Sequence, residues 1–118
     1  MAIIRITNLR LRTIIGTNDW ERNTKQDVVI NITFDYDATK AIAGDDLKQS
    51  VDYKIITKKI IQAVETSQFS LLEKLADRIL NIVLENHRVK AASVRVDKPH
   101  ALRFADSVSV ELHKKRKK

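Results

Sequence analysis

Residues 28–36 carry an apolar side chain at every second position, and this alternation constrains the fold of the chain more than any other feature. The apolar residues of the stretch are Val28, Ile30, Ile32, Phe34 and Tyr36, and polar residues occupy most positions between them. Because successive side chains of a β-strand point to opposite faces of a sheet, this period of two predicts a strand with one buried face. The fold must therefore contain a sheet and a second layer that covers one side of it.

The first 26 residues predict a strand with an irregularity, followed by a loop. Ile4 and Ile6 alternate in one phase and Leu9 and Leu11 alternate in the other, so the phase changes near Asn8. A β-bulge inserts one extra residue into a strand and produces such a change, and we predict a bulge at this point. The polar segment 15–26 then predicts a hairpin loop that leads into the strand at 27–37.

The middle of the chain has helical periodicity. Apolar residues recur at intervals of three or four in residues 56–64 and again, as a longer stripe, in residues 72–83. The polar connection 37–53 before them predicts one short helical turn. Two further alternating stretches, 92–98 and 104–112, predict the last two strands.

The predicted elements follow one another in the order β-β-α-α-β-β, without a repeat or a domain linker. We therefore predict a single α+β domain over residues 1–118. Its four-stranded antiparallel sheet is covered on one face by the two helices.

The formal net charge of +7 raises the question of a nucleic-acid partner. Five of the positive charges lie in the terminal run 114–118, so the rest of the chain carries a net charge of +2. Such a run can hold RNA but is commonly solvated, and we expect residues 113–118 to form a flexible basic tail. With three Phe, two Tyr and one Trp, the chain has few rings on which bases could stack. We expect no nucleic-acid partner, and RNA binding through the tail is the alternative.

Composition and spacing exclude several other classes of protein. The chain has no cysteine, so it has neither disulfides nor thiolate metal ligands. The three histidines lie about thirteen residues apart, which is not the spacing that places two imidazoles on one metal ion, and two glycines cannot build a phosphate-binding loop. No apolar run approaches the roughly 20 residues of a membrane helix, and the N-terminus lacks a signal-peptide pattern. We expect a cytoplasmic protein that does not interact with membranes.

A turn rich in ionisable residues connects the last two predicted strands. It reads DKPHALRFADSV from Asp97 to Val108 and contains the only proline of the chain, Pro99. Lys98 continues the phase of the apolar residues of its strand, and Asp106 shares the phase of the next strand, so both strand ends direct a charge toward the covered face. Lys98 can extend its ammonium group to water, or it can serve as an acid–base group. The pattern leaves both readings open.

Glu73 also has two readings, at the start of the second helix. Ser70 and Glu73 have the S-x-x-E spacing of a capping box, in which the glutamate bonds to a backbone N–H at the helix start. A carboxylate in this position can instead accept two N–H donors from a flat ligand. Glu21 and Tyr53 lie in or next to predicted loops, where surface residues are the default expectation.

Four segments together resemble the dihydroneopterin aldolase family of pterin metabolism. They are IGTNDWE (15–21), VDYKII (51–56), FSLLEKLA (69–76) and VDKPHALRFADSVSV (96–110), and together they span nearly the whole chain. Aldolases of the family usually carry a small residue such as Gly after the Lys-Pro pair. Here the segment HALRFADSVS (100–109) and the opening NLRLRTIIG (8–16) look like the epimerase branch of the family.

The resemblance implies an enzyme that acts on a reduced pterin without a cofactor or a metal ion. The epimerase branch inverts C2' of 7,8-dihydroneopterin triphosphate to give dihydromonapterin triphosphate, by retro-aldol and aldol chemistry at the C1'–C2' bond. The alternative is the aldolase reaction of folate biosynthesis, which cleaves dihydroneopterin to 6-hydroxymethyl-7,8-dihydropterin and glycolaldehyde. In both reactions the C=N bond of the dihydropterin ring takes up the electrons of the broken bond, so no Schiff-base lysine is required.

The resemblance also implies the tunnelling fold (T-fold), in which sheets of neighbouring subunits join in a ring and two tetrameric rings stack into a homo-octamer with active sites between subunits. Family roles at matching positions make Glu73, with the backbone of Leu72, the anchor for the 2-amino and N3–H edge of the pterin. Lys98, in cationic surroundings, promotes proton transfer at the side-chain hydroxyl. Tyr53 of the adjoining subunit packs near the ring and serves proton transfer, and Glu21 lies toward the reacting side chain.

The turn after Lys98 then has a role in holding the substrate. Pro99 stiffens the strand end. His100 and Arg103 are placed to meet a charged substrate tail, because the guanidinium group of an arginine can donate two hydrogen bonds to phosphate oxygens. A surface ion pair of Arg103 with Asp97 or Asp106 is the alternative.

Overall fold

The computed structural model describes residues 1–18 and 20–117, so Asp19 of the segment IGTNDWE and Lys118 of the basic tail lie outside the described residues. The sheet has five strands in the order β3-β1-β2-β4-β5. They are β1 (Ala2–Ile15), β2 (Lys25–Tyr36), β3 (Gln68–Phe69), β4 (Val89–Pro99) and β5 (Ser107–Lys115). The prediction of four antiparallel strands therefore needs one correction. The additional strand β3 is two residues long and pairs in parallel with Ile14 and Ile15 at the end of β1.

The predicted bulge in β1 is confirmed. Ile6 pairs with Ile32 of β2 and Leu9 pairs with Ile30, so two residues of β1 oppose the single residue Asn31. Asn8 adopts a left-handed backbone conformation with φ of 54°, and its N–H donates to Asn31 Oδ1 at 2.9 Å. Asn31 Nδ2 in turn donates to Asn8 Oδ1 at 3.2 Å. The bulge places the leucines that follow it on the same face of the sheet as the isoleucines that precede it.

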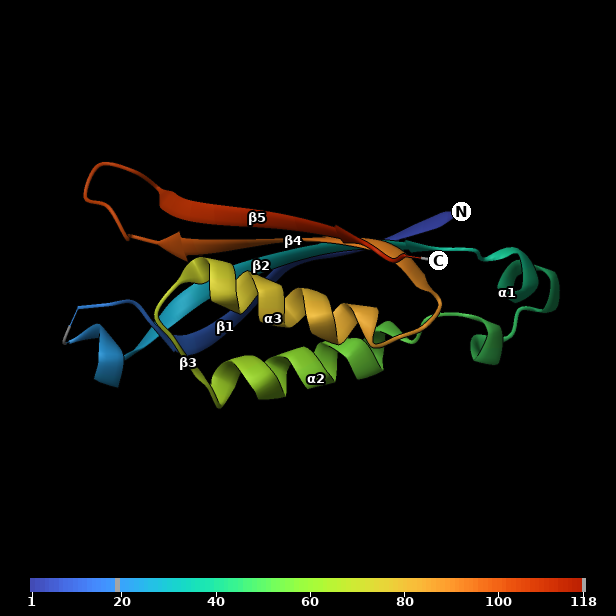
Figure 1. The fold of residues 1–118 in the computed structure, drawn as a ribbon, viewed down its shortest axis with the longest axis horizontal. Helices are drawn as coiled ribbons and strands as arrows, with labels where there is room; N and C mark the ends of the chain where they lie inside the picture. Colours follow the sequence, from blue (N-terminus) through green and yellow to red (C-terminus); the bar gives the residue numbers. More distant parts are fainter. Residues whose placement is uncertain (19, 118) are drawn as a thin grey trace.

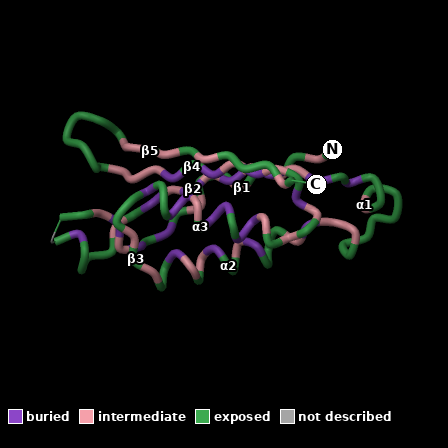
Figure 2. The backbone as a smooth tube through the Cα atoms, viewed as in Figure 1, coloured by how far each residue is buried: buried purple, intermediate pink, exposed green. Residues whose placement is uncertain are grey.

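Two long helices cover one face of the sheet, as predicted (Figure 1). They are α2 (Tyr53–Glu65) and α3 (Leu72–Leu84), and the polar connection before them forms the short helix α1 (Thr39–Gly44) and a 3₁₀ turn at Leu47–Gln49. None of the helices in the described part of the chain is long and apolar enough to cross a membrane. The buried parts of the chain lie on the strands and helices that face one another (Figure 2).

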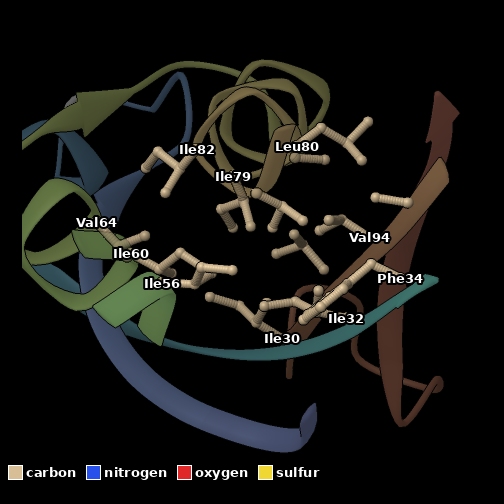
Figure 3. Close-up of a cluster of buried hydrophobic side chains, with 14 of the residues drawn as sticks. Ile30, Ile32, Phe34, Ile56, Ile60, Val64, Ile79, Leu80, Ile82 and Val94 are labelled. Carbon is tan, nitrogen blue, oxygen red and sulfur yellow. The ribbon is translucent and has the colours of Figure 1, made fainter. Parts of the chain in front are cut away.

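The core lies between the sheet and the two helices. The sheet contributes the alternating residues of β2 and β4, and each helix contributes one apolar stripe. The close-up in Figure 3 shows the two sets of side chains in contact range, with Ile30, Ile32, Phe34 and Val94 opposite Ile56, Ile60, Val64, Ile79, Leu80 and Ile82. This core fixes which side chains at the strand ends face the helices.

The last strand lies three residues later than predicted. Alternation suggested a strand at 104–112, whereas β5 spans Ser107–Lys115, and Phe104 is 95% exposed in the connecting turn. His100 causes the difference, because it adopts a φ of 62° and its N–H donates to the carbonyl of Asp106 at 3.3 Å, which closes the turn. Phe104 and Asp106 therefore do not point into the covered face.

Much of the segment that was expected to be a flexible tail is paired. Lys114 and Lys115 belong to β5 and pair with Ala92 and Ala91 of β4. The Lys114 ammonium group lies 3.7 Å from Asp77 Oδ1 of α3. The side chain of Arg116 donates hydrogen bonds to backbone carbonyls near the end of α3. The basic residues are thus part of the domain at least as far as Arg116.

Candidate active site

Lys98 lies on the covered face of the sheet, at the end of β4. Its side chain follows the buried residues Val94 and Val96 in the same phase and is only 13% exposed. The ammonium group forms an ion pair and hydrogen bond with Glu21 Oε2, and the Glu21 side chain is 8% exposed. The prediction that Lys98 faces the covered side is therefore confirmed. Its surroundings differ from the prediction, because its partner is a carboxylate and not a cation.

Two further groups hold the carboxylate of Glu21, which lies in a 3₁₀ turn (Glu21–Asn23) of the β1–β2 loop. The backbone N–H of Asn18 donates to Oε1 at 3.2 Å. Gln26 Nε2 donates to Oε2 at 3.2 Å and also to the carbonyl of Ile15 at 2.9 Å. The hydrogen bond from Lys98, followed by those from Gln26 and Asn18, lowers the pKa of Glu21 from 4.5 to about 2, although burial alone would raise it.

Gly16 makes this arrangement possible. Its φ is 131°, and a Cβ atom at this position would lie 2.4 Å from both Cδ and Oε1 of Glu21. No other residue can occupy the position without displacing the carboxylate. Sequence reasoning did not assign a role to Gly16 or Gln26. The only signal was that Gly16 is one of two glycines in the chain.

A small hollow lies beside Gly16, between the β1–β2 loop and β3. The N–H of Gly16 donates to the carbonyl of Phe69 in β3 at 3.0 Å. The hollow has a volume of about 130 Å³ and is lined by Ile14, Gly16, Arg22, Gln68, Phe69 and Ser70. The short strand β3 thus brings the beginning of α3 next to the loop that carries Glu21.

Glu73 lies in the first turn of α3 and is exposed to solvent. The capping-box reading is wrong, because the N-cap residue is Leu71 and no side chain caps the helix. Pairing of β3 with β1 holds the chain extended up to Phe69, so the helix begins at Leu72 and Glu73 is its second residue instead of its third. Among the described residues, no hydrogen bond or ion pair engages the Glu73 carboxylate, which leaves its oxygens available to a ligand.

Tyr53 lies far from these residues within one chain. It is the first residue of α2, follows the N-cap Asp52, and is 52% exposed. Because α2 and α3 run in opposite directions, the first turn of α2 and the first turn of α3 lie at opposite ends of the helix layer (Figure 1). One chain therefore brings Lys98, Glu21 and the start of α3 to one end but does not bring Tyr53 there.

His100 and Arg103 lie in the exposed turn between β4 and β5. The guanidinium carbon of Arg103 is 5.5 Å from the ring centre of Phe104. The suggested ion pairs of Arg103 are not formed in the described part of the chain. Asp97 instead accepts hydrogen bonds from Arg95 at 2.9 Å and from Ser107 at 2.8 Å.

The family model of dihydroneopterin aldolase (FolB) matches residues 4–113. The chain belongs to the dihydroneopterin aldolase family. Dihydroneopterin triphosphate 2'-epimerase of Escherichia coli strain K12 is 54% identical over 111 residues, which cover 94% of this chain and 92% of that protein. Dihydroneopterin aldolase of the same strain is 30% identical over 110 residues, which cover 93% of this chain and 90% of that protein. The enzymes in this family to which the chain is similar thus include an epimerase and, at lower identity, an aldolase.

Solved structures of the family confirm the fold. A dihydroneopterin aldolase structure from Vibrio cholerae has a TM-score of 0.93 at 28% identity, and the match covers 98% of each chain. The E. coli dihydroneopterin aldolase in complex with neopterin has a TM-score of 0.91 at 29% identity, and the match covers 97% of this chain and 99% of that one. The predicted tunnelling fold is therefore correct, apart from the additional short strand β3.

Proposed function

We propose that the chain is a dihydroneopterin triphosphate 2'-epimerase. The observation that carries the proposal is the Lys98–Glu21 ion pair, which is held largely out of solvent, together with the exposed carboxylate of Glu73 in the first turn of α3. The family supplies the substrate class, and the identity of 54% to an epimerase against 30% to an aldolase favours epimerisation. The product is dihydromonapterin triphosphate, a precursor of tetrahydromonapterin.

The exposed carboxylate of Glu73 suits the flat edge of a pterin. The 2-amino group and N3–H of the ring are two parallel donors, and a carboxylate accepts such a pair through both oxygens. The backbone of Leu72, in the same first helical turn, completes this edge contact. The reacting side chain of the pterin then extends toward Lys98.

Lys98 and Tyr53 serve the proton transfers, and Glu21 positions Lys98. Removal of the proton from the 2'-hydroxyl allows the C1'–C2' bond to break, and its electron pair moves into the C=N bond of the ring. Re-addition of the retained aldehyde from its other face inverts C2'. Lys98 acts at the hydroxyl, Glu21 holds the ammonium group in place, and Tyr53 of a neighbouring subunit takes part in the proton transfer.

A site completed by a second chain fits the geometry of the single chain. The hollow of about 130 Å³ is smaller than the roughly 300–1,000 Å³ of typical ligand pockets. Among the described residues, most of the outer edge of β1 and the outer edge of β5 have no strand partner, and such edges readily pair with other chains. We therefore propose a cytoplasmic homo-octamer of two stacked tetrameric rings, with His100 and Arg103 near the charged substrate tail.

The aldolase reaction is the second candidate. Cleavage follows when the aldehyde leaves and C1' takes up a proton, so both reactions share the same first step. The matching family model and the TM-score of 0.91 to an aldolase in complex with neopterin favour this alternative. The fate of the aldehyde distinguishes the two activities.

Product analysis with a Lys98→Ala variant tests the proposal. Wild-type protein is incubated with dihydroneopterin triphosphate and with dihydroneopterin, and the epimer and the cleaved product are separated by chromatography. We expect the epimer as the main product from the triphosphate, and a loss of about a hundredfold or more in turnover for Lys98→Ala with neopterin binding retained. Lys90→Ala, on the exposed part of the same strand, is the control. Unchanged turnover in Lys98→Ala would contradict the assignment.

A further inference from the structure

A second cavity lies where β2 and β4 separate. Its volume is about 330 Å³, and it is lined by Arg10, Leu11, Arg12, Asp27, Val28, Val29, Pro99 and His100. The last pair between the two strands is Val29 with Asp97, and beyond it Lys98 and Pro99 pair only with β5. The cavity therefore begins at the end of β4, immediately after Lys98.

The rim of this cavity is positively charged. Arg10 is exposed and, within residues 1–18 and 20–117, its guanidinium group has neither an ion-pair nor a hydrogen-bond partner. Arg12 is held in place, since its Nε lies 3.3 Å from Asp27 Oδ1 and its Nη2 donates to the carbonyl of Lys25 at 3.2 Å. The two guanidinium groups and the single carboxylate of Asp27 give the rim a net positive charge. The guanidinium group of Arg10 is the one available to a ligand.

The cavity and the Lys98–Glu21 pair lie on the two sides of one strand end. Lys98 points to the helix layer, and because side chains alternate, the next residue, Pro99, faces the other side and lines the cavity. The two segments that look like the epimerase branch of the family, 8–16 and 100–109, both contribute to the lining. They meet in space although some ninety residues separate them in the sequence.

We propose that this cavity binds the polyphosphate tail of the substrate, with Arg10 as the main phosphate ligand and with Arg12 and His100 beside it. The inference rests on the proposed function and adds the position of the tail. Phosphate oxygens accept bidentate hydrogen bonds from a guanidinium group, and an arginine without an internal partner can provide them without breaking an ion pair. Arg103 lies outside the lining, against Phe104.

An Arg10→Gln variant tests the proposal, with Arg5→Gln as a matched control. Arg5 is an exposed arginine on the same strand and the same face, opposite Thr33 and outside the cavity. For Arg10→Gln we expect the KM for dihydroneopterin triphosphate to rise about tenfold or more with little change in kcat, and the kinetics with unphosphorylated dihydroneopterin to stay unchanged. Arg5→Gln should behave as wild type on both substrates. Equal effects of Arg10→Gln on the two substrates, or equal effects of the two variants, would overturn the proposal.

Direct binding of inorganic triphosphate separates this proposal from the proposed function. By calorimetry, we expect the wild type and Arg5→Gln to bind inorganic triphosphate, and Arg10→Gln to bind it about tenfold or more weakly. If the wild type turns over neither pterin, the proposed function fails, and the calorimetry still decides whether the cavity binds polyphosphate. Equal binding by all three proteins would refute the phosphate site even if the enzyme is an epimerase.

Discussion

Glu21 is an ionisable residue that its neighbours hold tightly in place. Its carboxylate is nearly enclosed and accepts hydrogen bonds from Lys98, Gln26 and the backbone of Asn18, while Gly16 packs against it. Removing one partner of an enclosed ion pair leaves the other charge poorly solvated, so substitutions here affect stability as well as catalysis. Stability measurements can therefore detect this pair without any substrate.

The pH dependence of stability reports on Glu21. Folding lowers the pKa of Glu21 from 4.5 to about 2. The ionised carboxylate therefore stabilises the folded state above pH 4.5, by on the order of 3 kcal/mol, and this stabilisation is lost as the pH falls toward 2. We expect Glu21→Gln to lower the free energy of unfolding at pH 7 by up to this amount, and the difference from wild type to shrink at pH 3. Urea unfolding at both pH values measures it. Glu65→Gln, at an exposed position, is the control, and an equal deficit at both pH values would contradict the assignment.

The sequence predicted the residues of this site unevenly. Lys98 could be found from its phase, because strand alternation extends to the last residue of β4. Glu21 was predicted as a site residue only from the family resemblance. It lies in a loop and contacts a residue 77 positions away in the sequence, and local spacing carries no information about such a contact. Gln26 acts through a hydrogen bond from β2 to that same loop, and no periodic pattern marks such a residue.

At the scale of elements, Arg116 joins the end of the chain to the end of α3. Its Nε donates to the carbonyl of Val89 at 2.8 Å, and its Nη2 donates to the carbonyls of Asn86, at 3.0 Å, and of Leu84. The last carbonyls of a helix lack partners within the helix and carry partial negative charge, so a guanidinium group there is favourable. The terminal basic segment therefore has a structural role in this domain.

Replacing Arg116 tests this role. We expect Arg116→Ala to lower the free energy of unfolding by about 1–3 kcal/mol, because several carbonyls lose a charged donor. Lys117→Ala, at the exposed neighbouring position, should change it by less than about 0.5 kcal/mol. Chemical denaturation of the two variants and the wild type provides the comparison. Equal stabilities of the two variants would show that the segment is no more than a solvated tail.

Long periodic elements were predictable from their spacing, whereas the short strand β3 was not. The strand β2 and both long helices follow from their apolar spacing, since each buries one face against the core. The two-residue strand β3 exists only because β1 offers it a partner, and no period can be recognised in two residues. The start of β5 was predicted too early because alternation continues through Phe104 and Asp106 into a turn, where the conformation of His100 decides the path of the chain.

At the scale of the whole molecule, different parts of the proposed site lie near opposite ends of the helix layer. The chain is elongated, with extents of 52 × 26 × 24 Å. Lys98 lies at the end of β4, toward the start of α3, whereas Tyr53 begins α2 at the opposite end of the helix layer (Figure 1). A site that contains both Lys98 and Tyr53 therefore needs two chains. Each interface would bring the part of one chain that carries Lys98 against the part of its neighbour that carries Tyr53.

Mixing two inactive variants tests this arrangement. Tyr53→Ala and Lys98→Ala should each have low activity alone, because every site contains one altered residue. If the chains are unfolded together and reassembled in equal amounts, about a quarter of the sites receive both wild-type residues, and activity should recover toward that fraction. Product formation before and after mixing measures the recovery. A mixture no more active than the two separate variants would contradict a site shared between chains.

The bulge at Asn8 also determines what the two faces of β1 can carry. Ile4 and Ile6 face the helices, and in a strand of regular alternation the next positions in their phase would be Asn8, Arg10 and Arg12. If Thr7 and Asn8 did not share the place opposite Asn31, the two surfaces downstream would be exchanged, with two guanidinium groups in the hydrocarbon interior and two leucines in water. The bulge thus keeps the cationic side of the strand apart from its oily side.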